Sequence, residues 1–462
     1  MRRYAFPFLG LLALPGVAGA ETAAPAIDTG DTALVLMGAA LVLLMTPGLA
    51  FFYGGLVRGK NVVHTMLMSL VCMAVVAILW LTIGYSVAFS PGTWNAVIGG
   101  LGFVGFHGVG GDPLPDLSGT VPHAAFALFQ AMFAVITPAL ISGAVVERMR
   151  LRAFVLFVAL FSVVIYAPLA HWVWAPGGWL RELGALDFAG GTVVHINAAA
   201  AAMVAAMVVG PRRGTRREGA IVAPLPHHVP FALLGMGLLW FGWLGFNGAS
   251  ALAANGLAAV AFANTVFAGA GAAAAWSLLE LQIHGKMSGV GLASGVVAGL
   301  VAVTPAAGFV SPVSAAALGA AAGAICLGAV RIRPRIGLDD SLDVFAIHGV
   351  AGIIGALGTG LLASPAVNPA VPGGGLEPMA IQLVGVLATL AFSGLGSYGI
   401  LKLVGRITPL RAPEADELAG LDIAEAGERG YAADSDTGTG ELPTPVPSSG
   451  PIPSLTEAAE RP

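Results

Sequence analysis

The chain has 462 residues, of which 57% are hydrophobic and only 10% are charged, with 65 glycines and a formal net charge of −4. An ordinary soluble domain carries roughly 25% charged residues, so this composition excludes a typical water-soluble fold. The only two cysteines, Cys72 and Cys326, lie in apolar runs, so a disulfide framework is not implied and two buried thiols are expected.

The first twenty residues have the pattern of a secretory signal peptide. Arg2 and Arg3 precede an apolar stretch, and small residues up to Ala20 come before the polar Glu21. We therefore expect residues 1–20 to be cleaved off. The alternative interpretation is a short additional membrane anchor.

Eleven apolar stretches are long enough to cross a bilayer, because a helix needs about 20 apolar residues to span a core roughly 30 Å thick. The sequence therefore predicts an all-α polytopic membrane protein with about 11 transmembrane helices. The predicted spans are 32–57, 62–89, 123–146, 152–175, 187–210, 229–251, 256–282, 287–305, 309–330, 341–363 and 378–404.

Basic residues in the loops orient these spans, since lysine and arginine concentrate in short cytoplasmic loops. One side of the predicted topology has only Arg181, whereas the other has thirteen basic residues and is therefore cytoplasmic. This asymmetry predicts that the mature N-terminus lies outside and the C-terminus inside a cell membrane, either an inner or a plasma membrane. The other side has thirteen basic residues, namely Arg58, Lys60, Arg148, Arg150, Arg152, Arg212, Arg213, Arg216, Arg217, Lys286, Arg331, Arg333 and Arg335.

Composition also divides the chain into regions. Residues 21–405 contain all the predicted spans and form the predicted transmembrane domain, and 406–433 form a polar segment on the cytoplasmic side. From 434 to 462 the chain is rich in Pro, Ser, Thr and Gly, a composition typical of disorder.

A histidine recurs in the two halves of the predicted domain. His195 follows Asp187 by eight residues in the fifth span, and His348 follows Asp340 by eight residues in the tenth. This weak internal similarity predicts an inverted repeat of five plus five helices with one extra helix. Because eight helical residues advance about 12 Å, both imidazoles are expected near mid-membrane.

Ionisable groups at that depth usually line a pathway or pair with one another, and an imidazole exchanges protons near neutral pH. His195 and His348 are therefore predicted to be a proton-handling pair. The alternative is that each imidazole only makes an interhelical hydrogen bond. For Asp187, capping of a helix start is the expected main role, with an added field on a cation route as a second possibility.

Several motifs resemble those of the Amt, Mep and Rh superfamily of ammonium transporters, and most closely its bacterial Amt branch. The best of them is the stretch from Asp187 to Ala201, which reads DFAGGTVVHINAAAA. Matching stretches run from about residue 30 to 431 in the family order. They include 48–55, 129–148, 240–250, 293–308, 343–355 and 420–425.

The resemblance implies an outer substrate site at Trp174, Ser250 and Phe133. A cation over aromatic faces gains roughly 0.5 to 2 kcal/mol, and a serine oxygen accepts an N–H hydrogen bond that potassium does not offer. The segment from Trp174 to Asp187 is about one residue longer than in the family, so we expect a reshaped outer vestibule.

The resemblance further implies a gate of two stacked rings, Phe133 and Phe246, above a pore that contains His195 and His348. Ammonium would lose its proton near this gate, ammonia would cross the pore, and the proton would pass separately through the imidazoles. A passive ammonia channel and an ammonium sensor on the same scaffold are the alternatives; methylammonium is a possible second substrate.

Assembly and partners also follow from the resemblance alone. It implies a homotrimer with one pore per subunit, a cytoplasmic tail that couples the pores, and regulation by a PII-type signal protein from the cytoplasmic side. Neither nucleic acid nor a cofactor is expected. A metalloenzyme built on the two histidines is disfavoured, because no carboxylate or thiol has suitable spacing to complete a metal shell.

Overall fold

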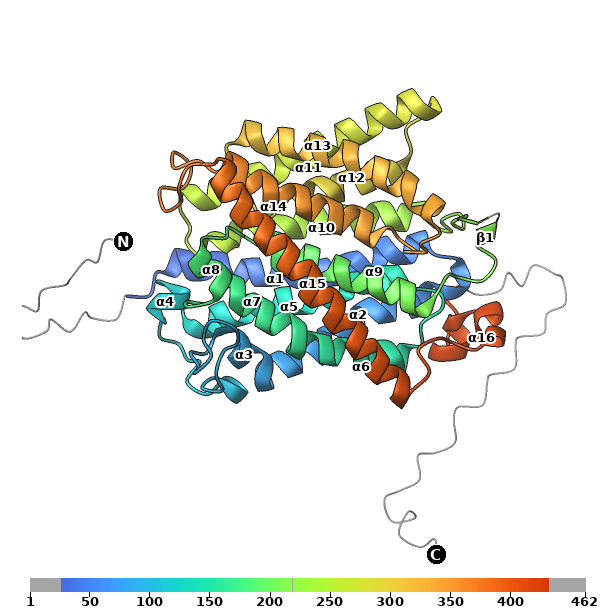
Figure 1. Cartoon of the computed structure of the whole chain (residues 1–462), viewed down its shortest axis with the longest axis horizontal. Helices are drawn as coiled ribbons and strands as arrows, with labels where there is room; N and C mark the ends of the chain where they lie inside the picture. The colour runs from blue at the N-terminus through green and yellow to red at the C-terminus, as the bar shows by residue number, and fades with distance from the viewer. Residues whose placement is uncertain (1–25, 218, 432–462) are drawn as a thin grey trace, which may run out of the picture.

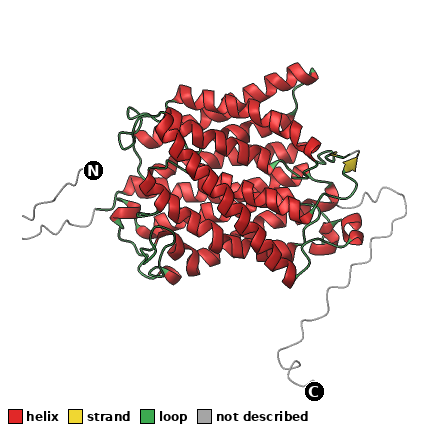
Figure 2. Ribbon diagram, viewed as in Figure 1, coloured by secondary structure: helices red, strands yellow, loops and turns green. Residues whose placement is uncertain are grey.

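The computed structural model describes residues 26–217 and 219–431. The predicted signal peptide, 1–20, and the predicted disordered segment, 434–462, lie outside the described residues. Within them the chain forms a bundle of helices that run side by side, and the one antiparallel strand pair, β1 with β2, lies at an end of the bundle (Figures 1 and 2).

The elements follow one another in two halves. The first half comprises α1 (Thr29–Leu56), η1 (Gly59–Asn61), α2 (Val62–Leu79), η2 (Trp80–Gly84), α3 (Tyr85–Phe89), η3 (Val104–Phe106), α4 (Pro115–Ser118), α5 (His123–Val145), α6 (Leu151–Phe161), η4 (Ser162–Tyr166), α7 (Ala167–Trp174), α8 (Trp179–Leu183), η5 (Gly191–Ile196) and α9 (Asn197–Val209). After β1 (Arg216–Arg217) and β2 (Ala220–Ile221) come α10 (Val229–Gly248), η6 (Ala249–Ala251), α11 (Gly256–His284), α12 (Gly289–Val303), α13 (Pro312–Ile332), η7 (Arg333–Ile336), η8 (Phe345–Gly349), α14 (Val350–Leu362), α15 (Leu376–Ile407), α16 (Glu414–Ala419) and η9 (Asp422–Ala426).

The prediction of about eleven membrane helices is confirmed. Ten helical segments of the described chain are long and apolar enough to cross a bilayer, and α12 is the eleventh and shortest. Every residue from 293 to 310 is buried, so the protein itself surrounds most of α12 and the irregular backbone after it. Such backbone is tolerated at membrane depth where protein rather than lipid covers it.

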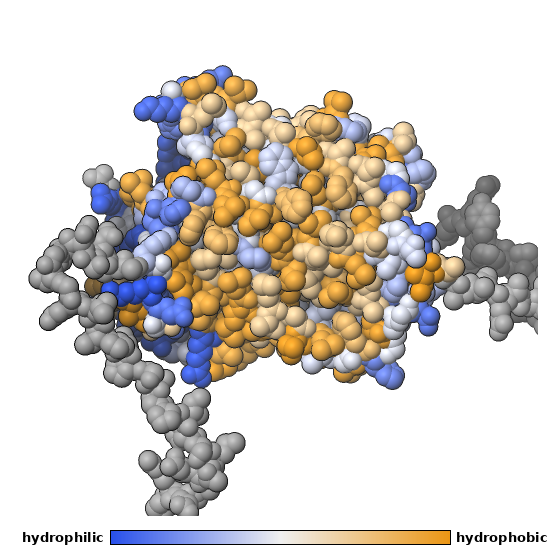
Figure 3. All heavy atoms as spheres, turned by 180° about the vertical axis from the view of Figure 1, so that it is seen from behind, coloured by the Kyte–Doolittle hydropathy of each residue, from blue (hydrophilic) through white to orange (hydrophobic). Residues whose placement is uncertain are grey.

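The surface agrees with a membrane location. Figure 3 shows apolar side chains in a broad band across the middle of the molecule, whereas hydrophilic side chains gather at its two ends. Exposed apolar residues on the candidate membrane-spanning segments include Leu81, Phe241, Phe267 and Leu387. A band of this kind replaces contact with water by contact with lipid chains.

The two halves meet where α1 packs along α10. A Cβ on Gly235 would lie 2.6 Å from the Gly48 carbonyl oxygen, and one on Gly55 would lie 2.6 Å from the Ala232 amide nitrogen. Backbones that approach this closely exclude larger side chains, and such packing holds membrane helices together where lipid gives no hydrophobic drive. The halves are therefore joined by a tight, glycine-lined contact.

The fifth and tenth spans begin four residues later than predicted. Helical structure starts at Gly191 rather than 187 and at Phe345 rather than 341, because Gly190 (φ 115°) and Asp343 (φ 60°) adopt left-handed backbone conformations before them. Each span then opens with a π-helical turn, η5 or η8. The two halves thus share the same local irregularity, and π turns are frequent at functional sites.

Charged residues gather at the end of the bundle that contains β1 and α16. The buried Glu147 carboxylate forms ion pairs with Arg58 at 2.9 Å and with Arg212 at 3.4 Å. Arg212 also forms an ion pair with Asp339 at 2.9 Å. Burial by itself raises the pKa of the Glu147 carboxyl, but hydrogen bonds and charges from the two arginines outweigh it and leave this pKa below its usual value. The network is a buried, mutually paired charge cluster.

Arg148 ties the two halves together at the same end. Its fully buried guanidinium donates hydrogen bonds to the carbonyl oxygens of Ala144 (2.8 Å), Gly210 (2.6 Å) and Asp339 (2.6 Å), and to the Ser341 hydroxyl (2.5 Å). Because it satisfies backbone groups from both halves, this side chain fixes the segment that leads into η8.

The polar segment after α15 folds back onto the bundle. The Lys60 ammonium donates to the carbonyl oxygens of Glu417 (2.8 Å) and Leu418 (2.6 Å), and the Asp422 carboxylate accepts from the His64 backbone N–H at 2.8 Å. The tail is thereby bound to the start of α2, next to the charge cluster.

We predict that Glu147→Gln lowers the free energy of unfolding at pH 7 by roughly 3 kcal/mol, because it leaves buried arginine charge uncompensated. The folded pKa lies below the ordinary value of 4.5, so the carboxylate's contribution is complete above that pH and is lost as pH falls through the folded pKa. The difference in free energy of unfolding between wild type and Glu147→Gln should therefore be constant from pH 7 to 5. It should become smaller at lower pH.

Thermal unfolding of the purified proteins in detergent between pH 3.5 and 7 measures this gap. Glu414→Gln is the control, because the Glu414 pair with Arg213 leaves the two side chains 63% and 42% exposed and is expected to change stability by less than about 1 kcal/mol. A Glu147→Gln gap that stays equally large at pH 3.5 contradicts the prediction.

Candidate functional site

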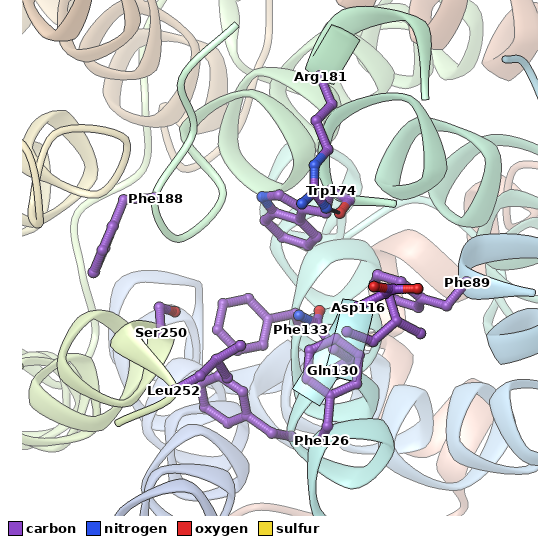
Figure 4. Close-up of a pocket in the computed structure, with 12 residues that line it drawn as sticks. Phe89, Asp116, Phe126, Gln130, Phe133, Trp174, Arg181, Phe188, Ser250 and Leu252 are labelled. Atoms are coloured by element: carbon purple, nitrogen blue, oxygen red, sulfur yellow. Dashed lines mark hydrogen bonds between the residues drawn. The ribbon is translucent and has the colours of Figure 1, made fainter. Parts of the chain in front are cut away.

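A cavity opens at the end of the bundle opposite to the charge cluster. It holds about 190 Å³ of space for a water-sized sphere and is lined by Phe133, Trp174 and Ser250 among other residues. Figure 4 shows these three side chains around one space, with Arg181 reaching toward Trp174. The structure therefore brings together the three residues predicted for the outer site.

Trp174, the last residue of α7, is held at two points. Its indole N–H donates to the Asp187 carbonyl oxygen at 2.9 Å, and its own carbonyl oxygen accepts a hydrogen bond from the Arg181 guanidinium. Its ring meets Phe133 edge-on, with centroids 5.9 Å apart. The orientation of the aromatic face toward the cavity is thus fixed before any ligand arrives.

Ser250, in η6, has its hydroxyl hydrogen engaged. It donates to the Phe246 carbonyl oxygen four residues earlier, at 2.8 Å. A hydroxyl oxygen has two lone pairs in addition to its single hydrogen, so this arrangement leaves the oxygen free to accept. Ser250 is therefore set up as an acceptor for an N–H donor in the cavity.

Two phenylalanine rings separate this cavity from an inner one. The rings of Phe133, on α5, and Phe246, on α10, lie 4.3 Å apart between centroids and are tilted by 37°. Phe133 lines the outer cavity and Phe246 lines the inner cavity. The stacked pair therefore forms the boundary between the two spaces.

The inner cavity is narrow and almost entirely apolar. It offers only about 10 Å³ to a water-sized sphere, about what one water molecule requires. His195 and His348 are the only titratable residues among those that line it. The others are Met45, Leu49, Phe52, Ile136, Leu140, Val194, Leu239, Trp243, Phe246 and Val297.

The two imidazoles face each other in this cavity. His195 comes from η5 and His348 from η8, and their Nδ1 atoms are 3.2 Å apart. The side chains are 1% and 4% exposed, and His195 Nε2 has no hydrogen-bond partner among the described residues. One Nδ1 must therefore donate while the other accepts, and a further ring nitrogen remains available.

Trp243 supports the pair and was not singled out from the sequence. Its ring stacks on His195 with centroids 5.3 Å apart and planes 22° apart, and its indole N–H donates to the Thr304 hydroxyl at 2.8 Å. The signal available in the sequence was its place in the stretch 242–248, which is the counterpart of 48–55 in the other half. The ring fixes the plane of one imidazole.

The Asp187 carboxylate is occupied by backbone donors. It accepts hydrogen bonds from the N–H groups of Gly190, Gly191, Thr192 and Val193, at 2.7 to 3.1 Å. These are the unpaired donors at the start of the fifth span. In the other half, Asp340 accepts from the Phe345 N–H at 2.7 Å, so equivalent carboxylates hold both π turns.

Asp116, Gln130 and Arg181 also line the outer cavity, and sequence reasoning missed their part in it. Asp116 lies on α4, in a loop region whose path no periodic pattern revealed. No group of three or more His, Cys, Asp or Glu side chains in the described part of the chain is arranged to hold a metal ion.

Two internally related halves, an apolar membrane band and a narrow cavity between them define a polytopic membrane transport protein. A model of the ammonium transporter family matches residues 33–431. The chain is 47% identical over 411 residues to an ammonium transporter of Bacillus subtilis, covering 88% of this chain and 99% of that one. The chain therefore belongs to the ammonium transporter family.

Solved structures agree with this assignment. The crystal structure of Saccharomyces cerevisiae Mep2 superposes with a TM-score of 0.78 at 35% identity, covering 84% of this chain and 88% of that one. A structure described as a sensor Amt protein superposes with a TM-score of 0.80 at 30% identity, covering 86% and 98%.

We predict that Asp187→Ala lowers the free energy of unfolding by roughly 2 to 4 kcal/mol, because four N–H groups lose their acceptor. Asp187→Asn keeps one acceptor oxygen and should lose about half as much. Thermal unfolding in detergent checks this order. The control is Asp28→Ala, which removes an exposed cap of α1 that accepts two N–H bonds and should cost about 1 kcal/mol. An Asp187→Ala protein as stable as wild type contradicts the prediction.

Proposed function

We propose that this protein recruits ammonium at the outer cavity, removes its proton near the phenylalanine pair, and conducts ammonia past His195 and His348. The proton crosses separately, through the imidazole pair. The observation that carries this proposal is the 3.2 Å contact between the two Nδ1 atoms inside an otherwise apolar cavity.

Recruitment rests on the outer cavity. A cation over the Trp174 face is attracted by the ring quadrupole, by roughly 0.5 to 2 kcal/mol. The Ser250 oxygen, whose hydrogen is already donated, accepts one N–H of the ammonium ion. Potassium gains the first interaction but has no hydrogen to offer the second, so the site favours ammonium.

Deprotonation follows from the character of the inner cavity. A charged group in a low-dielectric interior loses its hydration and gains little in return, and a cavity with room for about one water molecule supplies no new hydration shell. Neutral ammonia has no such penalty. The phenylalanine pair is therefore the place where shedding the proton lowers the barrier.

The imidazole pair offers the proton a path. An imidazole accepts a proton on one nitrogen and releases one from the other. With the Nδ1 atoms in contact and His195 Nε2 unpaired among the described residues, a proton that enters at one ring leaves from the other. Net transport is then electrogenic, whereas the passive gas-channel alternative carries no current.

A sensor role is the second candidate function. It is favoured by the likeness to the structure described as a sensor Amt protein, of which this chain covers 98%. A transport assay on the purified protein in liposomes separates the two functions, since a pure sensor binds ammonium without moving it.

The assembly and surroundings form part of the proposal. We place the protein in the cell membrane as a homotrimer, with the outer cavity outside and the charge cluster inside. The basic loops and the tail bound beside Lys60 support this orientation. The same cytoplasmic face is where a PII-type signal protein would dock, and methylammonium is a second substrate of suitable chemistry.

We predict that replacing both His195 and His348 with alanine abolishes the ammonium-evoked current, because the proton loses its relay. Current recording on supported bilayers under an ammonium gradient measures it, with a proton gradient alone as the baseline. His284→Ala is the matched control, since His284 is exposed at the end of α11 and should keep full current. Undiminished current in the folded double variant would defeat the proposed relay.

We predict that Trp174→Leu raises the half-saturating ammonium concentration by about 2-fold to 30-fold, the range that corresponds to a cation–π energy of 0.5 to 2 kcal/mol. The same bilayer currents, recorded over a concentration series, give this value. Trp94→Leu is the control, because Trp94 is 74% exposed and does not line the outer cavity. An unchanged half-saturation in Trp174→Leu counts against the outer site.

A further inference from the structure

A buried histidine near the outer cavity takes no part in the mechanism described so far. His171 lies in the last turn of α7, three residues before Trp174, and is 1% exposed. Its ring lies between two backbone carbonyl oxygens. Nδ1 is 2.8 Å from the oxygen of Ala88, and Nε2 is 2.6 Å from the oxygen of Asn95. Both ring nitrogens therefore face hydrogen-bond acceptors.

A neutral imidazole cannot satisfy both of these contacts. It has a hydrogen on one nitrogen and a lone pair on the other, whereas the imidazolium has a hydrogen on both. Because a carbonyl oxygen offers only lone pairs, a neutral ring would set lone pair against lone pair at 2.6 or 2.8 Å. The doubly protonated ring instead donates one hydrogen bond to each oxygen, and a charged donor makes such bonds stronger.

Two helix ends favour the positive form of the ring. Ala88 lies one residue before the end of α3, which closes the long helical segment Gly59–Phe89. Its carbonyl is one of those that a helix C-terminus leaves without an internal partner. His171 itself lies in the last turn of α7. Since the C-terminal end of a helix stabilises a nearby cation, both helices act on the imidazolium in the same sense.

No carboxylate in the described part of the chain compensates this charge. α7 packs against α3, η4, α8 and η5, and Trp172 meets the ring of Phe392 on α15. None of the charged or titratable side chains on these elements forms a hydrogen bond or ion pair with the His171 ring. They are Tyr85, Tyr166, Arg181, Glu182, His195, Glu377, Tyr398, Lys402 and Arg406. Backbone carbonyl groups therefore compensate the charge.

The imidazole ring connects α7 to a loop, residues 91–98, which we call the outer strap. Figure 1 shows α3, α7 and α8 near one another at this end of the bundle. The indole N–H of Trp172 donates to a strap carbonyl oxygen at 2.6 Å, and the Asn95 side-chain amide donates to the Pro176 carbonyl oxygen at 2.8 Å. The strap, which has no titratable residue of its own, thus contacts the chain on both sides of Trp174.

We propose that His171 is a protonated positioning residue, whose imidazolium fastens the outer strap to α3 and α7 and thereby fixes the Trp174 face in the outer cavity. A ring that loses one proton loses one of its two carbonyl contacts, so the strap and the end of α7 loosen. Because imidazoles commonly exchange a proton near neutral pH, outer acidity tunes the affinity for ammonium, which is higher at low pH. The effect on affinity rests on the proposed outer site, whereas the protonation of the ring does not.

Nitrogen-15 NMR of the full-length protein in detergent, with labelled histidine, tests the protonation itself. At pH 5 both ring nitrogens of His171 should bear a hydrogen; the signals of this ring are those absent from the His171→Gln protein. A ring with one bare nitrogen at pH 5 would overturn the inference, and this result stands whether or not the protein transports ammonium.

Bilayer currents test the coupling to the outer site. As the outer pH rises from about 5 to 8, the half-saturating concentration of ammonium ion should rise about 2-fold to 10-fold in wild type, within the range expected for loss of the Trp174 face. In His171→Gln it should be high at both pH values and no longer depend on pH. His107→Gln is the matched control, because His107 is exposed on the loop after η3 and should keep the wild-type profile.

A second variant, Asn95→Ala, releases the strap without altering the imidazole. It removes the side-chain bonds of Asn95 to the Pro176 carbonyl oxygen and the Gly92 N–H at a partly exposed loop position, so it is expected to fold even if His171→Gln does not. At pH 5 its half-saturation should match that of wild type at pH 8.

Three results would overturn the positioning role. The first is a wild-type half-saturation that is equal at pH 5 and 8. The second is a His171→Gln protein that keeps the wild-type pH dependence, which would assign the dependence to another group. The third is an Asn95→Ala protein with wild-type half-saturation at pH 5, which would mean that the strap does not position Trp174.

Discussion

The hydrogen-bond contact between His195 and His348 is the constraint on which the rest of this structure depends. The rings come from different halves of the chain, so their Nδ1 atoms reach 3.2 Å only if both halves are placed accurately. The glycine-lined approach of α1 to α10 and the buried Arg148 guanidinium provide that placement. Two adjacent cationic imidazoles would repel each other, and a contact between two Nδ1 atoms needs one ring to accept, so at least one of the two rings must be neutral at that nitrogen.

Charged side chains are placed so that no carboxylate, lysine or arginine lines the inner cavity. The Asp187 carboxylate accepts hydrogen bonds from four backbone N–H groups. The buried Glu147 carboxylate forms ion pairs with Arg58 and Arg212 at the end of the bundle that contains α16. An unpaired charge beside the inner cavity would attract water and influence the protonation of the two rings. The paired cluster at the other end instead stabilises the fold, and the dry interior is left to the two histidines.

The sequence predicted every span to within four residues of its helix, because each crossing of the bilayer needs a run of about 20 apolar residues. It also predicted two histidines at similar depth, from their equal spacing after Asp187 and Asp340. The sequence did not predict the π turns, the stacking of the Trp243 ring on His195 or the hydrogen bond from Arg148 to the Asp339 carbonyl oxygen. These features depend on contacts between segments far apart in the chain, which no local pattern records.

The outer cavity shows which force recruits a cation under the proposed mechanism. Arg181 and Asp116 both line it, so their formal charges cancel, and the Asp187 carboxylate faces backbone donors instead of the cavity. The net charge of these two lining residues therefore adds little attraction. Selection is left to short-range contacts, the fixed face of Trp174 and the accepting oxygen of Ser250. Such contacts distinguish ammonium from potassium by its N–H groups, which a field acting on charge alone does not.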